Sequence, residues 1–296
     1  MFSLNKNNVF NDNIGPDTEC WVAIGCGGSL ENDTDSGWPW QSPINIETSG
    51  TIPDDSSYPL KFFNYDLEPS SLTFTNDGRI PALTVNAASG AIPSFAYLNS
   101  TSKNATIYNL EAIHFHGMSE HQIDGQHAPL EIQFIHYDRA RGNSVQEALA
   151  ISIEDLGLDD ILGSVAILSV MATVGKFDNP AYGKLLRFLP FLKSFNSTRE
   201  VTNTPSMSSL LPDNTFKFYS YLGSMTSPIY TSEFAEYSEL AGQEVAFGCF
   251  PQVQWYIFEV MNIKDLLIRT SIKSFILLFR TLLNLLLAKW TRSWTC

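Results

Sequence analysis

Residues 113–121 read IHFHGMSEH and residues 130–136 read LEIQFIH, and these two stretches decide the fold. Apolar and polar residues alternate in both, which predicts two β-strands, and the turn Gln122–Gln126 lets the second strand return beside the first. Because side chains alternate between the faces of a strand, His114 and His116 point to the same side. Two imidazoles at i and i+2 can begin a zinc site, and a catalytic zinc usually takes three protein ligands plus an open position for water.

The rest of the chain predicts one sheet-rich domain with little helix. The apolar run Val165–Val174 is either a buried strand or a buried helix, which periodicity cannot separate. Residues 1–58 are rich in Gly, Asn, Asp, Ser and Pro and are expected to be irregular. Further strands are expected at Leu72–Phe74, Leu83–Val85 and Val253–Val260, and short helices at Asn143–Glu154 and Asn179–Leu192. The expected fold class is mainly β (α+β).

Composition narrows the classes of function. The chain has 296 residues, of which 44% are apolar, and this is ample for a packed core. The formal net charge of -13 argues against nucleic acid as a partner, because phosphate binding needs a basic surface. Four cysteines are present without a Cys-x-x-Cys pair, so a thiolate zinc site is not expected.

Four Asn-x-Ser/Thr sequons suggest a glycoprotein of the secretory pathway, located outside the cell or in an organelle lumen. They begin at Asn32, Asn99, Asn104 and Asn196. The competing interpretation is chance occurrence in a chain rich in Ser, Thr and Asn. Residues 1–20 contain no apolar signal-peptide segment, which implies an incomplete start or a protein that is not exported.

The C-terminal tail, residues 264–296, differs from the rest of the chain. It carries six basic residues and one acidic residue, and Phe275–Ala288 is nearly all Leu, Ile and Phe apart from Arg280 and Asn284. A membrane span needs about 20 apolar residues. This shorter run predicts a helix, and its polar positions recur at helical spacing, as in an amphipathic helix in peripheral contact with a membrane. A helix packed on the domain and a gene-model error are equally good alternatives.

Several blocks in consistent order resemble the α-carbonic anhydrase family. They are residues 41–46 (QSPINI), the two histidine-bearing stretches above, residues 219–228 (YSYLGSMTSP) and residues 253–255 (VQW). The resemblance implies a single domain with a large twisted, mostly antiparallel central sheet and short peripheral helices. It divides the chain into an irregular segment 1–13, a carbonic anhydrase-like domain 14–263 and the tail 264–296.

The resemblance also implies a zinc lyase that hydrates carbon dioxide reversibly to bicarbonate. Zinc lowers the pKa of its bound water to about 7, and the resulting hydroxide attacks carbon dioxide. In this family Thr226 would orient the hydroxide and Glu120 would accept the hydrogen bond of Thr226. The implied metal positions are His114, His116 and Gln133, with Glu131 orienting the third. The implied lining of the carbon dioxide pocket is Ile135, Ile167, Met225, Ser227 and Trp255, although core packing explains the apolar ones equally well.

Gln133 is the main departure from the family pattern, because it stands where the third histidine ligand is expected. His136 cannot replace it, since three positions later on a strand the side chain points to the opposite face. His121 and His127 belong to the turn region. The amide oxygen of Gln133 could ligate zinc, but it suits zinc less well than imidazole, so weaker metal affinity is expected.

Other departures also bear on activity. Arg79 stands at the position of the proton-shuttle histidine and cannot shuttle protons. Ala112 replaces the glutamine that steadies the first zinc histidine. Residues 229–248 are an insertion, either a surface loop or translated non-coding sequence. Cys26 and Cys249 match the disulfide pair of secreted relatives, and a reduced pair is the alternative.

Two functions therefore remain. The favoured one is a zinc enzyme of reduced activity, because a pure scaffold has no chemical need for Glu120 and Thr226. The alternative is a catalytically silent carbonic anhydrase-related binding module, which Gln133, Ala112 and the insertion favour.

Overall fold

A computed structural model describes most of the domain, and the features below refer to that part of the chain. The described residues are 2–4, 42–53, 59–76, 80–98, 105–150, 163–173, 180–192, 194, 196–226, 238–240, 243–245 and 253–258. The strands of the main sheet are β1 (Phe2–Leu4), β3 (Thr51–Pro53), β4 (Lys61–Phe63), β5 (Ser71–Asn76), β6 (Pro81–Asn86), β7 (Ser94–Leu98), β8 (Ala105–Gly117), β11 (Leu130–Asp138), β12 (Val165–Ala172), β13 (Ser197–Val201), β14 (Phe218–Gly223) and β17 (Val253–Phe258).

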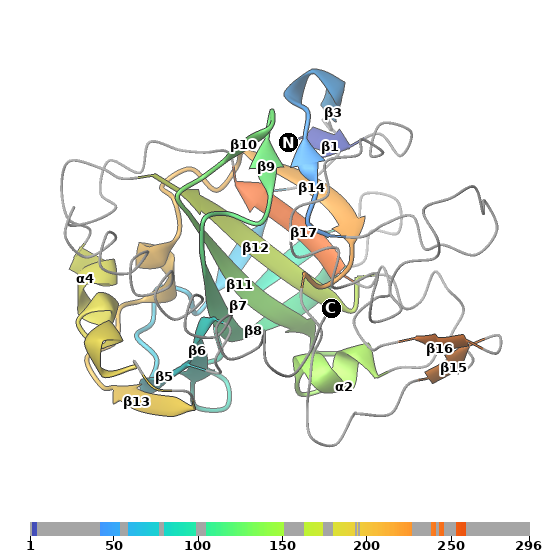
Figure 1. Cartoon of the computed structure of the whole chain (residues 1–296). Helices are drawn as coiled ribbons and strands as arrows, with labels where there is room; N and C mark the ends of the chain where they lie inside the picture. Colours follow the sequence, from blue (N-terminus) through green and yellow to red (C-terminus); the bar gives the residue numbers. More distant parts are fainter. Residues whose placement is uncertain are drawn as a thin grey trace.

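These strands form one large twisted sheet through the middle of the molecule (Figure 1). Its main path runs β13-β5-β6-β8-β11-β12-β17-β14-β1-β3, and β7 pairs with both β8 and β4. Neighbouring strands are antiparallel except in the pairs β12–β17 and β1–β14, which are parallel. The expectation of a large, mostly antiparallel sheet is confirmed.

The apolar run that begins at Val165 is a strand rather than a helix. Every residue of β12 is buried, because the strand lies inside the sheet with apolar side chains covering both faces. Its neighbour β11 is also buried along its whole length, although it carries Glu131, Gln133 and His136. Buried polar groups need hydrogen-bond partners, so these three side chains indicate polar networks within the core.

The turn between β8 and β11 carries a small sheet of its own. Strands β9 (Gln122–Ile123) and β10 (Gln126–His127) form a hairpin, and β2 (Asn45–Ile46) pairs with β9. Asp124 and Gly125 at its tip have φ values of 49° and 73°. Asp-Gly is the residue pair that suits two successive positive φ values, which explains the tight return of the chain.

The helices are short and lie at the periphery (Figure 1). They are α2 (Val145–Leu149), α4 (Pro180–Leu186) and the 3-10 turns η1 (Thr48–Gly50), η2 (Leu189–Phe191) and η3 (Met207–Leu210). Helix α2 begins after Ser144, whose Oγ accepts the N–H of Glu147 at 3.1 Å. It is shorter than the expected Asn143–Glu154, and residues 151–162 lie outside the described part of the chain.

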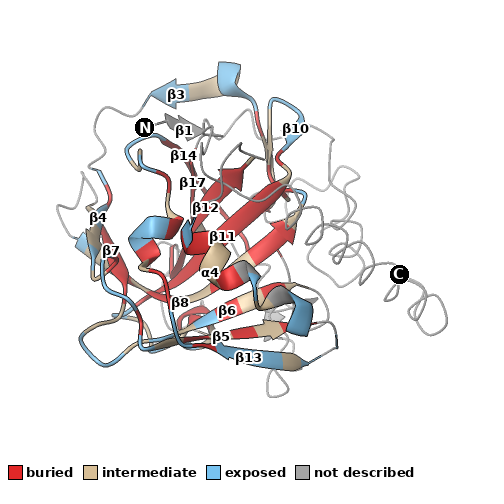
Figure 2. Cartoon of the chain, turned by 90° about the vertical axis from the view of Figure 1, so that its left-hand side faces the viewer, coloured by how far each residue is buried: buried red, intermediate tan, exposed pale blue. Residues whose placement is uncertain are grey.

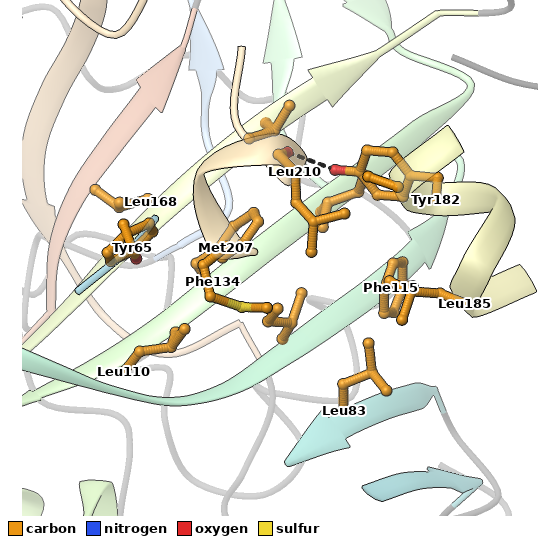
Figure 3. Close-up of a cluster of buried hydrophobic side chains, with 14 of the residues drawn as sticks. Tyr65, Leu83, Leu110, Phe115, Phe134, Leu168, Tyr182, Leu185, Met207 and Leu210 are labelled. Atoms are coloured by element: carbon orange, nitrogen blue, oxygen red, sulfur yellow. Dashed lines mark hydrogen bonds between the residues drawn. The ribbon is translucent and has the colours of Figure 1, made fainter. Parts of the chain in front are cut away.

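The core consists of two apolar clusters, one on each face of the sheet, and Figure 2 shows the burial concentrated on the central strands. Alternate residues of one strand contribute to opposite clusters, as Phe134 and Ile135 of β11 do. The larger cluster is covered by α4 and η3, where the Tyr182 hydroxyl donates to the Leu210 carbonyl at 2.7 Å (Figure 3). The smaller cluster lies on the face that carries His114 and His116.

The N-terminal region is less irregular than expected. Residues 2–4 form β1, which extends the main sheet beside β14 and β3, so a wholly irregular segment 1–13 is wrong at that point. Part of the insertion 229–248 also has regular structure, because β15 (Ser238–Leu240) pairs with β16 (Gln243–Val245).

Several sequence predictions lie outside the described residues: Arg79, Ser227, Cys26, Cys249, Asn32, Asn99, Asn104 and the tail 264–296. Within the described residues, no helix has the length and apolar character that a membrane crossing requires.

Candidate functional site

Strand pairing places the two histidines beside Gln133. In the antiparallel register of β8 and β11, Gln133 lies opposite His114 and Glu131 lies opposite His116. The imidazole centroids of His114 and His116 are 6.4 Å apart, and both project from the same face of β8. His116 is buried and His114 is half-buried. The three side chains that the family resemblance assigned to a metal are therefore neighbours on one face of the sheet.

Glu131 is a buried anion saturated with hydrogen-bond donors. Its five donors are the backbone N–H groups of Glu120 (2.8 Å) and His121 (3.0 Å), His121 Nδ1 (2.8 Å), Gln133 Nε2 (3.0 Å) and Ser169 Oγ (2.8 Å). Burial alone would raise the pKa of the Glu131 carboxyl, but His121 and these hydrogen bonds outweigh it and hold the pKa well below its usual range. Glu131 is therefore ionised at neutral pH.

Gln133 connects this anion to a second one. Its amide nitrogen donates to Glu131 Oε1 at 3.0 Å and to Glu120 Oε2 at 2.8 Å, and only 1% of the residue is exposed. Both amide hydrogens are therefore directed at carboxylates, since carboxylates only accept. The amide oxygen is the single donor atom that Gln133 retains for any other ligand.

Glu120 connects the pair of carboxylates to His116 and Thr226. Glu120 Oε1 lies 3.2 Å from His116 Nδ1, and the carboxylate accepts a hydrogen bond from the Thr226 side chain. Burial raises the pKa of Glu120, but His116 and the hydrogen bonds from His116 and Thr226 outweigh it, so the net shift is downward. An ionised Glu120 fixes the direction of the Thr226 hydroxyl, because the hydroxyl hydrogen must point to it.

A chain of hydrogen bonds supports Glu131 from behind. His121 Nε2 lies 2.7 Å from the Tyr221 hydroxyl, which in turn lies 2.7 Å from Ser42 Oγ. Ser42 and Ser224 then bind each other twice, through the N–H of each and the Oγ of the other, at 3.0 and 3.2 Å. These residues come from three distant parts of the chain, so they tie the QSPINI block and the β14 end to the centre of the site.

Sequence reasoning missed Ser42, Ser169 and Tyr221 as parts of this network. Ser42 and Tyr221 lie inside recognised family blocks, but nothing local indicates that they touch. Ser169 carried a usable signal, because it is the only hydroxyl residue within the otherwise apolar β12. A polar group in a fully buried strand needs a partner, and here the partner is Glu131.

The apolar residues assigned to the carbon dioxide pocket gather in the smaller core cluster. Ile135, Ile167, Met225 and Trp255 are each at most 5% exposed and all belong to this cluster. The indole N–H of Trp255 donates to the Ser224 carbonyl at 3.0 Å, which ties the ring to the segment that leads to Thr226.

His136 lies on the other face of β11, as strand alternation predicts. Its Nε2 is 2.6 Å from the Tyr65 hydroxyl, and its ring packs edge-on against Phe95 in the larger cluster. Burial lowers the pKa of His136 to about 3. His121 is engaged with Glu131 and Tyr221, and the exposed His127 contacts Gln122. The geometry offers none of these three as a third partner for His114 and His116.

The residues present fit a zinc ion only as a weak site. Among the described residues, no group of three or more His, Cys, Asp or Glu side chains is arranged to hold a metal ion. The available donors are the imidazoles of His114 and His116 and the amide oxygen of Gln133. Two histidines with an oxygen ligand form a known type of zinc site, but a neutral amide oxygen contributes less than imidazole or carboxylate.

Comparison with known proteins supports the family indicated by these features. Residues 31–237 match the family model described as eukaryotic-type carbonic anhydrase. The chain is 26% identical over 226 residues to carbonic anhydrase 6 of Mus musculus, covering 73% of this chain and 59% of that protein. It is 28% identical over 256 residues to carbonic anhydrase 12 of Homo sapiens, covering 83% of this chain and 58% of that protein.

A third relative has a different name. The chain is 30% identical over 207 residues to receptor-type tyrosine-protein phosphatase zeta of Homo sapiens, covering 64% of this chain but only 8% of that protein. The chain thus spans less than two thirds of carbonic anhydrases 6 and 12, and a small part of this much longer relative.

Proposed function

Because this chain belongs to the eukaryotic-type carbonic anhydrase family, we propose that it catalyses the reversible hydration of carbon dioxide to bicarbonate, more slowly than a site with three histidines. The observation that carries the proposal is the hydrogen bond from Thr226 to the ionised Glu120, next to His116. A hydroxyl held in one direction by a carboxylate can orient a nucleophile. A domain that only binds a partner has no chemical need for this arrangement.

The proposed zinc ligands are His114, His116 and the amide oxygen of Gln133. When bound, zinc supplies a water of lowered pKa, about 7 at a well-tuned site. The reduced rate follows from the third ligand. Gln133 donates both amide hydrogens to Glu120 and Glu131, so its oxygen is held in a fixed direction. The neutral amide oxygen nevertheless remains a weak ligand for zinc.

The roles of the surrounding residues follow from their hydrogen bonds. Thr226 gives its hydrogen to Glu120 and keeps only lone pairs, so it accepts a hydrogen bond from the nucleophile and turns it toward the substrate. Glu131 fixes the orientation of Gln133. The apolar side chains of Ile135, Ile167, Met225 and Trp255 would receive carbon dioxide, and the family resemblance adds Ser227 to this lining.

A second candidate is the carbonic anhydrase-related binding module without catalysis. The observation that favours it is again Gln133, whose amide is already fully engaged with two carboxylates. The relative named as a tyrosine-protein phosphatase shows that sequences of this kind also occur within larger proteins of another name.

We also propose the remaining organisation that the sequence suggested. The carbonic anhydrase-like domain spans residues 14–263, a disulfide joins Cys26 to Cys249, and the protein passes through the secretory pathway. The tail 264–296 would make peripheral contact with a membrane surface.

The deciding experiment measures zinc content and carbon dioxide hydration of the purified full-length chain. We expect less than one tightly held zinc per chain, and weak hydration activity that rises when zinc is added. Thr226→Val should abolish this activity, and Gln133→His should raise both zinc content and activity. Gln146→His, on helix α2, is the matched control. An absence of activity in the zinc-loaded parent would refute the enzyme and leave the binding module.

A further inference from the structure

Glu111 faces the candidate site because of a β-bulge in β8. Its neighbours Leu110 and Ala112 lie opposite consecutive residues of β11, which leaves Glu111 as an extra residue between them. Leu110 belongs to the larger core cluster, whereas Glu111 Oε2 accepts the N–H of Val145, a residue of the smaller cluster, at 2.6 Å. The bulge therefore turns the Glu111 carboxylate to the face that carries His114.

This carboxylate is held in place without being neutralised. Helix α2, which packs against β11 (Figure 1), supplies the Val145 N–H and carries Glu147, whose negative charge acts on Glu111. Arg141 precedes the helix, but its Nε is paired with Asp138 Oδ2 at 3.1 Å. Glu111 therefore brings a negative charge to this face without a cation of its own.

The other two carboxylates on this face differ from Glu111 in having imidazole partners. Glu120 contacts His116 at 3.2 Å, and Glu131 contacts His121 at 2.8 Å. Among the residues that the structure describes, none of the four ion pairs includes Glu111. A ligand that enters the site therefore meets the charge of Glu111 without a compensating positive charge.

The distance is short enough for this charge to act on a ligand bound at the histidines. Glu111 and His114 are three residues apart on β8, which corresponds to about 10 Å along a strand. At this separation, with an effective dielectric constant between about 20 and 80, one unit charge changes the affinity for a monovalent anion by about 2- to 15-fold.

We propose that Glu111 determines the ligand specificity of this site by disfavouring anions. The inference rests on the proposed function and deepens it, because the two forms of the substrate differ in charge. Bicarbonate carries one negative charge and is repelled by the ionised Glu111, whereas carbon dioxide is uncharged and is not. Other small monovalent anions, such as thiocyanate, are disfavoured for the same reason.

The test measures thiocyanate binding to the cobalt(II)-loaded full-length chain by the visible absorption of cobalt. Cobalt(II) accepts the same nitrogen and oxygen ligands as zinc. Burial raises the pKa of Glu111, so the measurement is made at pH 8 to keep its carboxyl ionised. Glu111→Gln removes the charge and keeps an oxygen that can accept the Val145 N–H. We expect this variant to bind thiocyanate about 2- to 15-fold more tightly than the parent at low ionic strength, and the difference to decrease at about 0.5 M salt.

Glu147→Gln is the matched control, because it removes the same charge from an exposed position on α2. Its amide oxygen can still accept the Asn143 N–H, which the Glu147 carboxylate accepts at 2.7 Å. Solvent screens an exposed charge, so this control should change thiocyanate affinity by less than about 2-fold. Equal gains in Glu111→Gln and Glu147→Gln would overturn the assignment to Glu111, since net charge alone would then explain both.

Two further results would overturn the proposal. One is an unchanged thiocyanate affinity in Glu111→Gln. The other is a full-length chain that binds neither cobalt nor zinc, which would remove this inference together with the proposed function. Failure of the proposed function alone has a different signature: the metal-loaded chain would show the expected difference in thiocyanate affinity and yet would not hydrate carbon dioxide.

Discussion

Replacing Glu131 by glutamine tests the electrostatic centre of the site. The amide nitrogen of the new side chain would have to face either the two backbone N–H groups at Oε2 or the three side-chain donors at Oε1. Backbone N–H groups cannot turn away, so the nitrogen should choose the Oε1 side. There Ser169 can rotate its hydroxyl to accept. Gln133 cannot adapt without losing its hydrogen bond to Glu120.

The magnitude follows from this count. One buried donor left facing another costs about 1–3 kcal/mol, and the lost charge on the remaining hydrogen bonds adds to it. We therefore expect Glu131→Gln to lower the free energy of unfolding by about 2–4 kcal/mol at pH 7. With a urea m-value of about 3 kcal/mol/M, the midpoint should fall by about 1 M.

The pH dependence has a definite sign. The pKa of Glu131 is lower in the folded state than in the unfolded state, where it is about 4.3. The ionised Glu131 therefore contributes its full stabilisation of the folded state above about pH 5, and this stabilisation is lost as pH falls through the folded-state pKa. The difference in unfolding free energy between the parent and Glu131→Gln should be constant from pH 7 to 5 and should become smaller below pH 5.

Urea unfolding followed by circular dichroism from pH 7 to 4 measures both effects. Glu111→Gln is the matched control, because burial raises the pKa of Glu111 and its carboxylate accepts one hydrogen bond, from the Val145 N–H at 2.6 Å, which an amide oxygen can also accept. We expect this control to change stability by less than about 1 kcal/mol. The reasoning would be refuted if Glu131→Gln lowered the unfolding free energy by less than about 0.5 kcal/mol at pH 7. It would also be refuted if the difference in unfolding free energy between parent and variant were the same at pH 4 as at pH 7.

Three further predictions follow from the backbone and the surface. Met118 has a φ of 71° and a side chain 53% exposed, so Met118→Gly should raise the unfolding free energy by about 0.5–1 kcal/mol in urea denaturation, and an unchanged or lower value would count against strain there. Gly223→Ala should lower the unfolding free energy by about 2–4 kcal/mol, because the added Cβ would overlap Ser42 Oγ and lie 2.7 Å from Tyr221 Cε2; a change below about 1 kcal/mol would show that the Ser42 and Tyr221 side chains can move aside. Asn196 is exposed before the sheet-edge strand β13, so chain secreted from eukaryotic cells should lose a glycan mass at this residue in Asn196→Gln, and an identical mass would contradict the site.

The sequence was sufficient to predict the strands and the face of the sheet to which their side chains point, because alternation is a local property. His114 and His116 share a face, His136 faces away, and β8 and β11 pair through the Asp-Gly turn, all as expected. Whether the run from Val165 was strand or helix could not be decided locally, since a strand buried on both faces has no alternation to detect. In the structure this run is the strand β12, which lies between β11 and β17.

The connections within the site were less accessible to sequence reasoning. Gln133 was identified as a missing histidine, which is a statement about one position. That its two hydrogens meet Glu120 and Glu131 depends on the cross-strand register and on the turn that brings Glu120 back over β11. Such contacts join residues whose spacing carries no periodic pattern, so they become visible only in three dimensions.

The hydrogen-bond chain behind Glu131 begins at its anionic end. An ionised carboxylate only accepts, so His121 Nδ1 must carry the hydrogen in the contact at 2.8 Å. His121 Nε2 lies 2.7 Å from the Tyr221 hydroxyl, which in turn lies 2.7 Å from Ser42 Oγ. Ser42 Oγ in turn accepts the N–H of Ser224, so a continuous chain of hydrogen bonds joins Ser224 and Ser42 to Glu131. The QSPINI block therefore helps to hold a charge about ninety residues further along the chain, which explains why a site centred on β8 and β11 needs that distant segment.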